Sequence, residues 1–300
     1  EYSYGSKINT VNGISGAKFI IYRVAHLYPT YIFCLFIATF LYYGGSTAIQ
    51  LIQGHDFLIN LFMLQSWIPK DTYAFQFNGL AWAVSTEVFF YLTFVFLAGA
   101  KSSRLVFLNL LIWTAIIFIT FTVGTNVSAP NWFYYINPVC RVAEFFLGVL
   151  LCRVYLSSDL QISVKVATAL EIFAISVLLA FILLAVYFQP PWLYRWQLWY
   201  VIPCSILIYV FAYDKGLISY VLSRKVFQLL GELSFALYTV HVICLTIVKR
   251  MFLINSDREF YYAFCVAIIG TLMSIVVAYL MNRYLGRPAN NFIGFRFDCV

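Results

Sequence analysis

Eight stretches of this chain are each long and apolar enough to cross a lipid bilayer. They are continuous runs, whereas a transmembrane β-barrel shows alternating segments of about ten residues, so each run predicts a membrane helix of about 20 residues. The predicted spans are residues 25–44, 80–98, 105–124, 138–157, 166–188, 196–213, 229–249 and 261–283. The sequence therefore predicts an all-α fold, a polytopic transmembrane helical bundle that forms one domain over residues 1–300.

The composition agrees with this fold class and excludes several functions. Only 10% of the residues are charged, against about 25% in soluble domains. The net charge of +7 does not indicate a nucleic-acid partner, because the basic residues lie at the ends of apolar runs rather than on one polar face. Seven cysteines and three histidines form no cluster with metal-ligand spacing, so we expect no metal.

The distribution of basic residues predicts the orientation in the membrane. Most Lys and Arg residues fall on one side when the loops alternate, and that side is cytoplasmic by the positive-inside rule. Both ends of the chain are then cytoplasmic, and the long connection at residues 45–79 lies outside. Residues 56–67 within it could form an amphipathic helix in the membrane interface.

Two basic residues share a helical face at the cytoplasmic mouth of the first span. Arg23 and His26 are three residues apart, and Pro29 then introduces the predicted membrane helix. Two cationic groups on one face suit a phosphate-bearing ligand that arrives from the cytoplasm. The alternative is that both side chains are topology anchors that extend to the interface.

A carboxylate lies deep in the second span. Glu87 sits within an apolar run, four residues before Tyr91 and two after Ser85. A charge in hydrocarbon is costly unless it faces a partner or a water-filled cavity. A carboxylate beside a hydroxyl can position a general base or take a proton, so the site is a functional candidate. The alternative is a structural carboxylate paired to another helix.

Further polar residues occur in later spans. Arg141 and Glu144 are three residues apart and either neutralise each other within the helix or project into a central cavity, while Gly148 would allow close packing of helices. Ser234, Tyr238 and His241 follow helical spacing and could line one stripe, although a lone membrane histidine is more often a hydrogen-bonding residue between helices than a catalyst. Glu171 has no obvious partner in the sequence.

Taken in order, these segments resemble the acyltransferase 3 family of integral membrane acyltransferases. Tyr2-Ser-Tyr-Gly5 is similar to the stretch after that family's second membrane helix, and Arg23-x-x-His26-x-x-Pro29 to its Arg-x-x-Arg motif ahead of proline. Trp82-x-x-Ser85-x-Glu87-x-x-Phe90-Tyr91 resembles its Trp-x-x-Ser-x-Glu-x-x-Phe-Tyr signature. Arg141 to Gly148 and Gly231 to His241 are similar to two later motifs, and Arg287-Pro288 to its ending.

The resemblance implies ten membrane helices and an acyl transfer. The donor would be a cytoplasmic acyl-CoA, often acetyl-CoA, and the acceptor a hydroxyl of a sugar, a surface glycan or a lipid-linked sugar at the bacterial inner membrane. Since residue 1 is Glu rather than Met, we expect that two helices are missing before it. The family's essential histidine lies on the first of these helices, so we expect the chain as given to be inactive alone, with O-acetylation performed by the complete protein.

Each candidate residue receives a role from this resemblance. Arg23 and His26 would hold the CoA phosphates, although His26 stands where the family usually has a second Arg and, when neutral, holds phosphate more weakly. Glu87 and Ser85 would support the missing base, and Arg141 would stabilise negative charge. Two rival functions remain at this point, a transporter of a glycan or small polar molecule and a catalytically inactive scaffold of the same fold.

Overall fold

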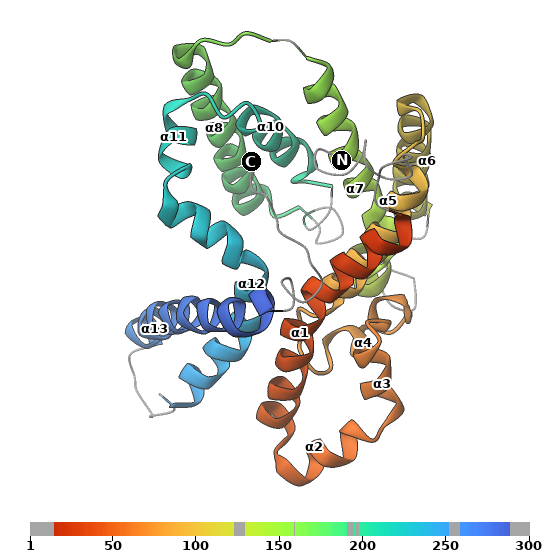
Figure 1. Cartoon of the computed structure of the whole chain (residues 1–300), viewed down its shortest axis with the longest axis vertical. Helices are drawn as coiled ribbons and strands as arrows, with labels where there is room; N and C mark the ends of the chain where they lie inside the picture. The colour runs from red at the N-terminus through yellow and green to blue at the C-terminus, as the bar shows by residue number, and fades with distance from the viewer. Residues whose placement is uncertain are drawn as a thin grey trace. The chain divides into compact units, whose positions relative to one another are not determined.

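The computed structural model describes residues 15–122, 130–158, 160–190, 195, 198–251 and 259–288, and all regular elements among them are helical. Helices lie in all eight predicted ranges, which confirms the all-α fold (Figure 1). These helices are α1 (Gly16–Tyr43), α5 (Trp82–Leu97), α6 (Ser102–Thr122), α7 (Pro138–Ser157), α8 (Val164–Phe188), α10 (Val201–Phe211), α12 (Lys225–Met251) and α13 (Glu259–Met281).

The lengths and compositions of these helices are those of a multi-pass membrane protein. Among the described residues five helices are long and apolar enough to span a bilayer, namely α1, α6, α8, α12 and α13 with the π-helical turn η3 (Asn282–Gly286) that follows it. The helices α5 and α10 are shorter and also apolar. The helix α7 is 20 residues long and carries Arg141, Glu144 and Arg153 among its apolar residues.

The first helix begins well before its predicted start. It runs from Gly16 over 28 residues and contains Pro29 in its interior, so the prediction that Pro29 introduces the helix was wrong. A proline inside a helix removes one backbone hydrogen bond and costs about 3 kcal/mol, which the long apolar segments on both sides of it offset. As a consequence, Arg23 and His26 lie within α1 rather than ahead of it.

The long connection between α1 and α5 consists of short helices, not of one amphipathic helix. It contains α2 (Gly45–Ile52), α3 (His55–Leu61), the 3₁₀ turn η1 (Gln65–Trp67) and α4 (Asp71–Phe75). The helical path is interrupted at Met63, whose backbone is left-handed, with a φ of 56°. The predicted helix over residues 56–67 is therefore wrong.

Buried side chains tie this connection to α1 and α5. The hydroxyl of Tyr31 donates to the Asn60 carbonyl at 2.5 Å, and the Gln65 amide donates to the Ala81 carbonyl at 2.9 Å. Leu27, Tyr31 and Leu35 of α1 form one core with residues of the connection and of α5, including Phe57 and Val84. The connection thus folds back and fixes the position of α5 against α1.

The described residues divide into two compact units. The first unit comprises the described parts of Glu1–Gly16 and Leu92–Gln228, and the second comprises those of Ala17–Tyr91 and Leu229–Val300. In the second unit α1, α12 and α13 share a core that includes Cys34, Val240 and Ala278. A side chain at Gly270 of α13 would come within 2.5 Å of Leu245, so the glycine permits a close approach of α13 to α12.

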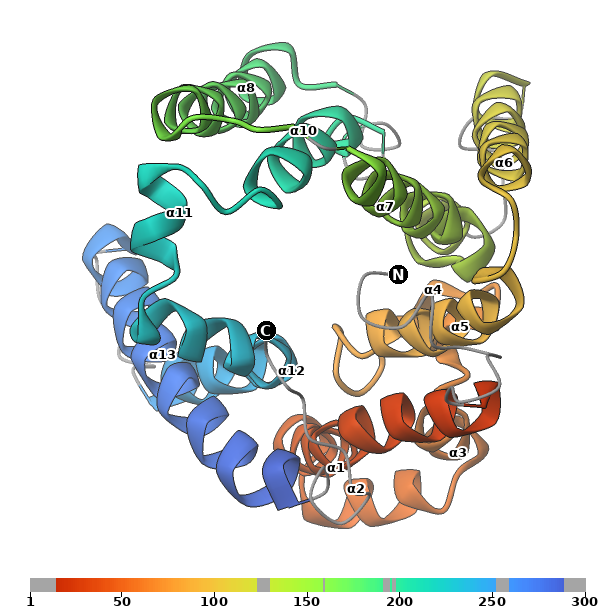
Figure 2. The same ribbon diagram turned by 45° about the horizontal axis from the view of Figure 1, so that its top comes forward.

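In the first unit α6 packs on α7, and α10 packs on both α7 and α8 (Figure 2). A buried hydrogen bond joins α6 to α7, from the Asn109 amide to the Ala143 carbonyl at 3.1 Å. The indole of Trp199, just before α10, donates to the Phe181 carbonyl of α8 at 2.9 Å. These contacts place α10 between its two neighbours.

Glu171 of α8, which the sequence left without a partner, has four donors. Its carboxyl oxygens accept the backbone N–H groups of Gly216, Ile218 and Ser219 at 3.0 to 3.3 Å and the Ser219 hydroxyl. These groups begin the short helix α11 (Leu217–Leu222). A side chain at Gly216 would overlap the carboxyl group, within 2.1 Å. Glu171 therefore satisfies the N-terminal donors of α11, which otherwise lack intrahelical acceptors.

Candidate functional site

Two basic residues of α1 face the carboxylate of α5 in the second unit. Arg23 and His26 both interact electrostatically with Glu87, which confirms that they share a face of α1. The Arg23 guanidinium lies 5.5 Å from the ring centre of Tyr91 and 5.6 Å from that of Phe19. Both rings flank the cation, so its position is fixed by aromatic contacts as well as by charge.

Glu87 is half-buried and hydrogen-bonded within its own helix. The hydroxyl of Tyr91 donates to the Glu87 carboxylate, as their spacing of four residues predicts. The ring of Tyr91 packs edge-on against Phe19 of α1, with 6.0 Å between the centroids. The Arg23 charge on the facing helix and the Tyr91 hydroxyl make the half-buried carboxylate tenable between apolar helices.

Ser85 is fully buried on the side of α5 that meets the connection between α1 and α5. Its hydroxyl donates to the Met63 carbonyl at 2.5 Å and lies 2.5 Å from the Ser66 hydroxyl. These bonds hold the turn around η1 against α5. The predicted catalytic role of Ser85 stays a prediction, and the geometry gives this residue a clear part in positioning the helix that carries Glu87.

Arg141 and Glu144 form an ion pair at the start of α7 in the first unit. The Nη1 of Arg141 lies 2.6 Å from the Oε1 of Glu144, and its Nε donates to the Tyr135 carbonyl at 2.8 Å. The Tyr135 ring lies 4.9 Å from the guanidinium carbon. Asn137 and Pro138 begin the helix, because the Asn137 side chain accepts the Val139 N–H at 2.9 Å. The predicted pairing within the helix is confirmed.

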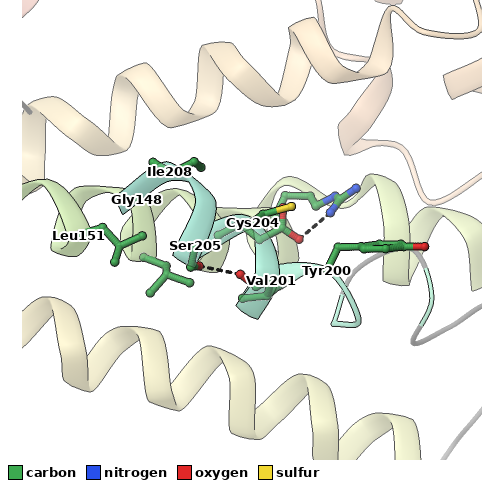
Figure 3. A pocket seen from close by; sticks show the side chains of 10 residues that line it. Gly148, Leu151, Tyr200, Val201, Cys204, Ser205 and Ile208 are labelled. Carbon is green, nitrogen blue, oxygen red and sulfur yellow. Dashed lines mark hydrogen bonds and ion pairs between the residues drawn. The ribbon is translucent and has the colours of Figure 1, made fainter. Parts of the chain in front are cut away.

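The ion pair also lines a cavity of about 250 Å³ between α7 and α10, which we call the α7–α10 slot. Its wall is formed by Arg141, Glu144, Leu147, Gly148 and Leu151 from α7, and by Tyr200, Val201, Cys204, Ser205 and Ile208 from the segment of α10. Figure 3 shows Tyr200 at one end, with Leu151 and Ile208 at the other. Arg141 is thus paired within its helix, as one of the two alternatives predicted, and it also contributes to the wall of this slot.

The stripe predicted on α12 is not part of the buried face of that helix. Ser234 is exposed, and Tyr238 and His241 are half-exposed. The Nδ1 of His241 lies 2.9 Å from the Tyr238 carbonyl and 3.1 Å from that of Leu237, both in its own helix. The buried face of α12 is the other one, which includes Val240 and Ile243. His241 thus behaves as a helix residue that bonds to its own backbone.

The charged residues described above lie within sequence motifs, and comparison with known families shows which family these motifs belong to. The model of the acyltransferase 3 family, described as an acyltransferase domain, matches residues 5–283. The chain belongs to this family. It is also 26% identical over 310 residues to the acyltransferase MdmB of Streptomyces mycarofaciens, covering 91% of this chain and 74% of that protein. No solved structure matches.

Membership of the acyltransferase 3 family confirms the resemblance drawn from the motifs. The motifs at Arg23, Glu87, Arg141 and Gly231 all lie inside the matched range. Arg287 and Pro288 lie beyond that range, and Arg287 pairs with Glu232 at 3.4 Å. The stretch Tyr2 to Gly5 and the last cysteine, Cys299, lie outside the described residues.

Three contacts of this acyltransferase were not predictable from spacing alone. Phe19 lies one helical turn before Arg23, so helical periodicity carries a weak signal for its contact. Tyr135 belongs to a π-helical turn, Trp132–Ile136, which no pattern in the sequence indicates. Cys204 of α10 reaches the α7–α10 slot only through packing. In the described part of the chain no group of three or more His, Cys, Asp or Glu residues has the geometry to hold a metal.

Proposed function

We propose that this acyltransferase transfers an acyl group, in particular acetyl, from acyl-CoA to a hydroxyl of a sugar or surface glycan. The observation that carries the proposal is the facing of Arg23 and His26 toward Glu87 in a motif of the family. The acceptor oxygen forms a bond to the acyl carbonyl carbon, the carbon–sulfur bond breaks, and CoA leaves as the thiol after taking up the proton that the hydroxyl loses.

The cations of α1 are suited to hold the phosphates of the donor. A guanidinium has five N–H donors, so Arg23 can serve a phosphate while it interacts with Glu87. The aromatic rings of Phe19 and Tyr91 orient its plane, which favours a bidentate contact. His26 contributes a second donor from the same face, weaker for phosphate than an arginine there.

The carboxylate of Glu87 supports the proton transfer. It lies among a hydroxyl and two basic groups, so it can orient or discharge the group that deprotonates the acceptor. Ser85 contributes through its bonds to Ser66 and Met63, which hold α5 in place. Arg141, kept rigid by Glu144 and Tyr135, supplies positive charge for the oxyanion that forms on the acyl carbonyl.

The proposal includes a location in the cell. The acyltransferase is a multi-pass protein of the bacterial inner membrane, both ends of residues 1–300 are cytoplasmic, and the connection from α1 to α5 faces outward. The excess of basic residues on one side supports this orientation. Donor and acceptor then meet within the membrane domain from opposite sides.

Transfer of labelled acetyl from acetyl-CoA tests the proposal. Membranes that contain the protein expressed from its complete reading frame are incubated with acetyl-CoA, and alkali-labile esters on glycan and lipid-linked sugar are counted. Label in these esters with the wild type, and its loss with Glu87→Gln, supports the proposal. Movement of a glycan across the membrane without any acyl-CoA would instead support the transporter, and neither activity would support the inactive scaffold.

A further inference from the structure

The α7–α10 slot has a polar end and an apolar end. Arg141 and Glu144 are in the first two turns of α7, whereas Leu151 lies ten residues after Arg141, about 15 Å further along the helix at ~1.5 Å per residue. The guanidinium is largely buried, with 13% of the Arg141 side chain exposed, against 35% for Glu144. Leu147, Gly148 and Cys204 also line the slot.

The Ser205 hydroxyl in the wall of the slot is already engaged. It donates to the Val201 carbonyl of its own helix at 2.6 Å, as the dashed line between them in Figure 3 shows. Beyond the ion pair and Tyr200, the slot therefore offers an occupant a mainly hydrocarbon surface, interrupted by the Cys204 thiol. A volume of about 250 Å³ holds roughly eight water-sized groups at ~30 Å³ each, which corresponds to a short hydrocarbon chain.

Gly148 is the smallest residue in this wall, and the space beside it is open. A side chain added at Gly148 would meet no atom within 4 Å, although the residue lies in the middle of a membrane helix. Any larger residue there would extend into the slot. The space beside Gly148 is thus available to a ligand, and it lies between the charged end and Leu151.

We infer that the α7–α10 slot holds the hydrocarbon tail of the acyl group during transfer, with the acyl carbonyl at Arg141, and that Gly148 sets the acyl length accepted. This inference rests on the proposed function. The guanidinium donates to the carbonyl oxygen, and the tail extends past Gly148 toward Leu151 and Ile208. In the proposed orientation Arg141 lies toward the outer face, so the carbonyl is on the acceptor side and the tail points to the membrane centre.

A series of acyl-CoA donors tests the inference. Values of kcat/KM are measured with acetyl-, butyryl- and hexanoyl-CoA for the wild type, Gly148→Ala and Gly148→Leu, in membranes that contain the protein from its complete reading frame. We expect the wild type to use all three donors. Each methylene that loses its place in the slot should lower kcat/KM about fourfold. A leucine at position 148 that displaces about two methylenes should therefore lower the ratio of hexanoyl to acetyl transfer roughly 15-fold, and Gly148→Ala should lower it less.

The control is a leucine at another glycine with open surroundings. Gly99, after α5, also has no atom within 4 Å of an added side chain and lies outside the slot, so Gly99→Leu should keep the wild-type ratio. Leu151→Ala lengthens the slot and should raise the ratio of hexanoyl to acetyl transfer. This second variant decides the matter if Gly148→Leu does not accumulate in the membrane.

The outcomes separate this inference from the proposed function. Transfer of acetyl with ratios unchanged in Gly148→Leu, or in Leu151→Ala where that variant decides, overturns the slot and leaves the acyltransferase proposal standing. A wild type that accepts acetyl-CoA and rejects butyryl-CoA overturns it as well. If no acyl-CoA of any length is used, both fail.

Discussion

The hydroxyl of Tyr91 donates a hydrogen bond to the carboxylate of Glu87, one turn earlier in α5. The same Tyr91 ring lies under the guanidinium of Arg23 from α1. A single tyrosine thus contacts both the carboxylate and the cation of the candidate site. These two contacts explain how a carboxylate and a guanidinium are maintained between apolar helices. They also indicate which substitutions remove a charge and which remove only a contact.

Substitution of Glu87 tests the role of its charge. Glu87→Gln keeps the size of the side chain and removes the negative charge, so acyl transfer should fall by about 100-fold or more if the carboxylate assists proton transfer. Tyr91→Phe removes only one hydrogen bond to that group and should lower kcat about tenfold. Both are measured as initial rates of acetyl ester formation at saturating acetyl-CoA. A wild-type rate in Glu87→Gln would contradict the role.

Arg23 should govern the affinity for the donor. Arg23→Ala should raise KM for acetyl-CoA about tenfold or more, because a charge-assisted contact to phosphate is lost. Arg23→Lys keeps the charge but loses the planar contacts with Phe19 and Tyr91, so it should restore KM only in part. Lys18→Ala removes an exposed cation from the same helix and is the control. An equal rise in KM for Lys18→Ala would mean that only the general charge of α1 matters.

A substitution at His26 should lower the KM for acetyl-CoA rather than raise it. His26→Arg places a permanent charge and a planar donor where the family usually has arginine, so it should lower KM for acetyl-CoA several-fold. His26→Gln keeps a neutral donor and serves as the matched variant, with a KM near that of the wild type. A higher KM in His26→Arg would show that this face of α1 does not contact the phosphates.

Particular residues show how far the sequence could predict this structure. The eight apolar runs and the pairs Arg141–Glu144 and Glu87–Tyr91 were predictable, because length, hydropathy and helical spacing are local properties. The partners of Glu171 were not, since the backbone donors at the start of α11 lie more than 40 residues away. The predicted start of α1 at residue 25 is wrong, because the apolar residues around Phe19 extend the helix on the N-terminal side of Arg23, to Gly16.

The candidate site shows the same division. The shared face of Arg23 and His26 follows from their spacing, but their facing toward Glu87 depends on how α1 packs on α5, which is a tertiary contact. The bonds of Ser85 to Ser66 and Met63 depend on a connection whose turn at Met63 has a left-handed backbone. The α7–α10 slot arises from two helices that are far apart in sequence, so no single run of residues indicates it.

Removal of either charge of the ion pair should cost more than removal of both. Arg141→Met leaves Glu144 without its cation, and Glu144→Gln leaves the guanidinium without its anion, so each should lower stability by about 3 kcal/mol or more. The double variant Arg141→Met with Glu144→Leu should recover much of this loss, yet acyl transfer should stay about 100-fold below the wild type. Thermal unfolding in detergent and the transfer rate are both measured. A double variant with wild-type activity would exclude Arg141 from the reaction.

Glu171 should be a determinant of stability without affecting the kinetics of the folded protein. Glu171→Ala leaves three backbone N–H groups and a hydroxyl without their acceptor and should destabilise the protein by about 3 kcal/mol, whereas Ser219→Ala, which removes one of these donors, should cost about 1 kcal/mol. Unfolding midpoints in detergent give both values, and KM for acetyl-CoA is the second measurement. A change in KM in Ser219→Ala would assign this cluster to the donor site.

We propose that the protein carries an acyl group from a cytoplasmic acyl-CoA to an acceptor on the other side of the membrane. Sealed inside-out vesicles provide the test, with labelled acetyl-CoA added to the exposed cytoplasmic face and alkali-labile esters measured in the lumen. We expect luminal esters with the wild-type protein and a loss of about 100-fold or more with Glu87→Gln. No esters with the wild type, or equal amounts with both proteins, would contradict it.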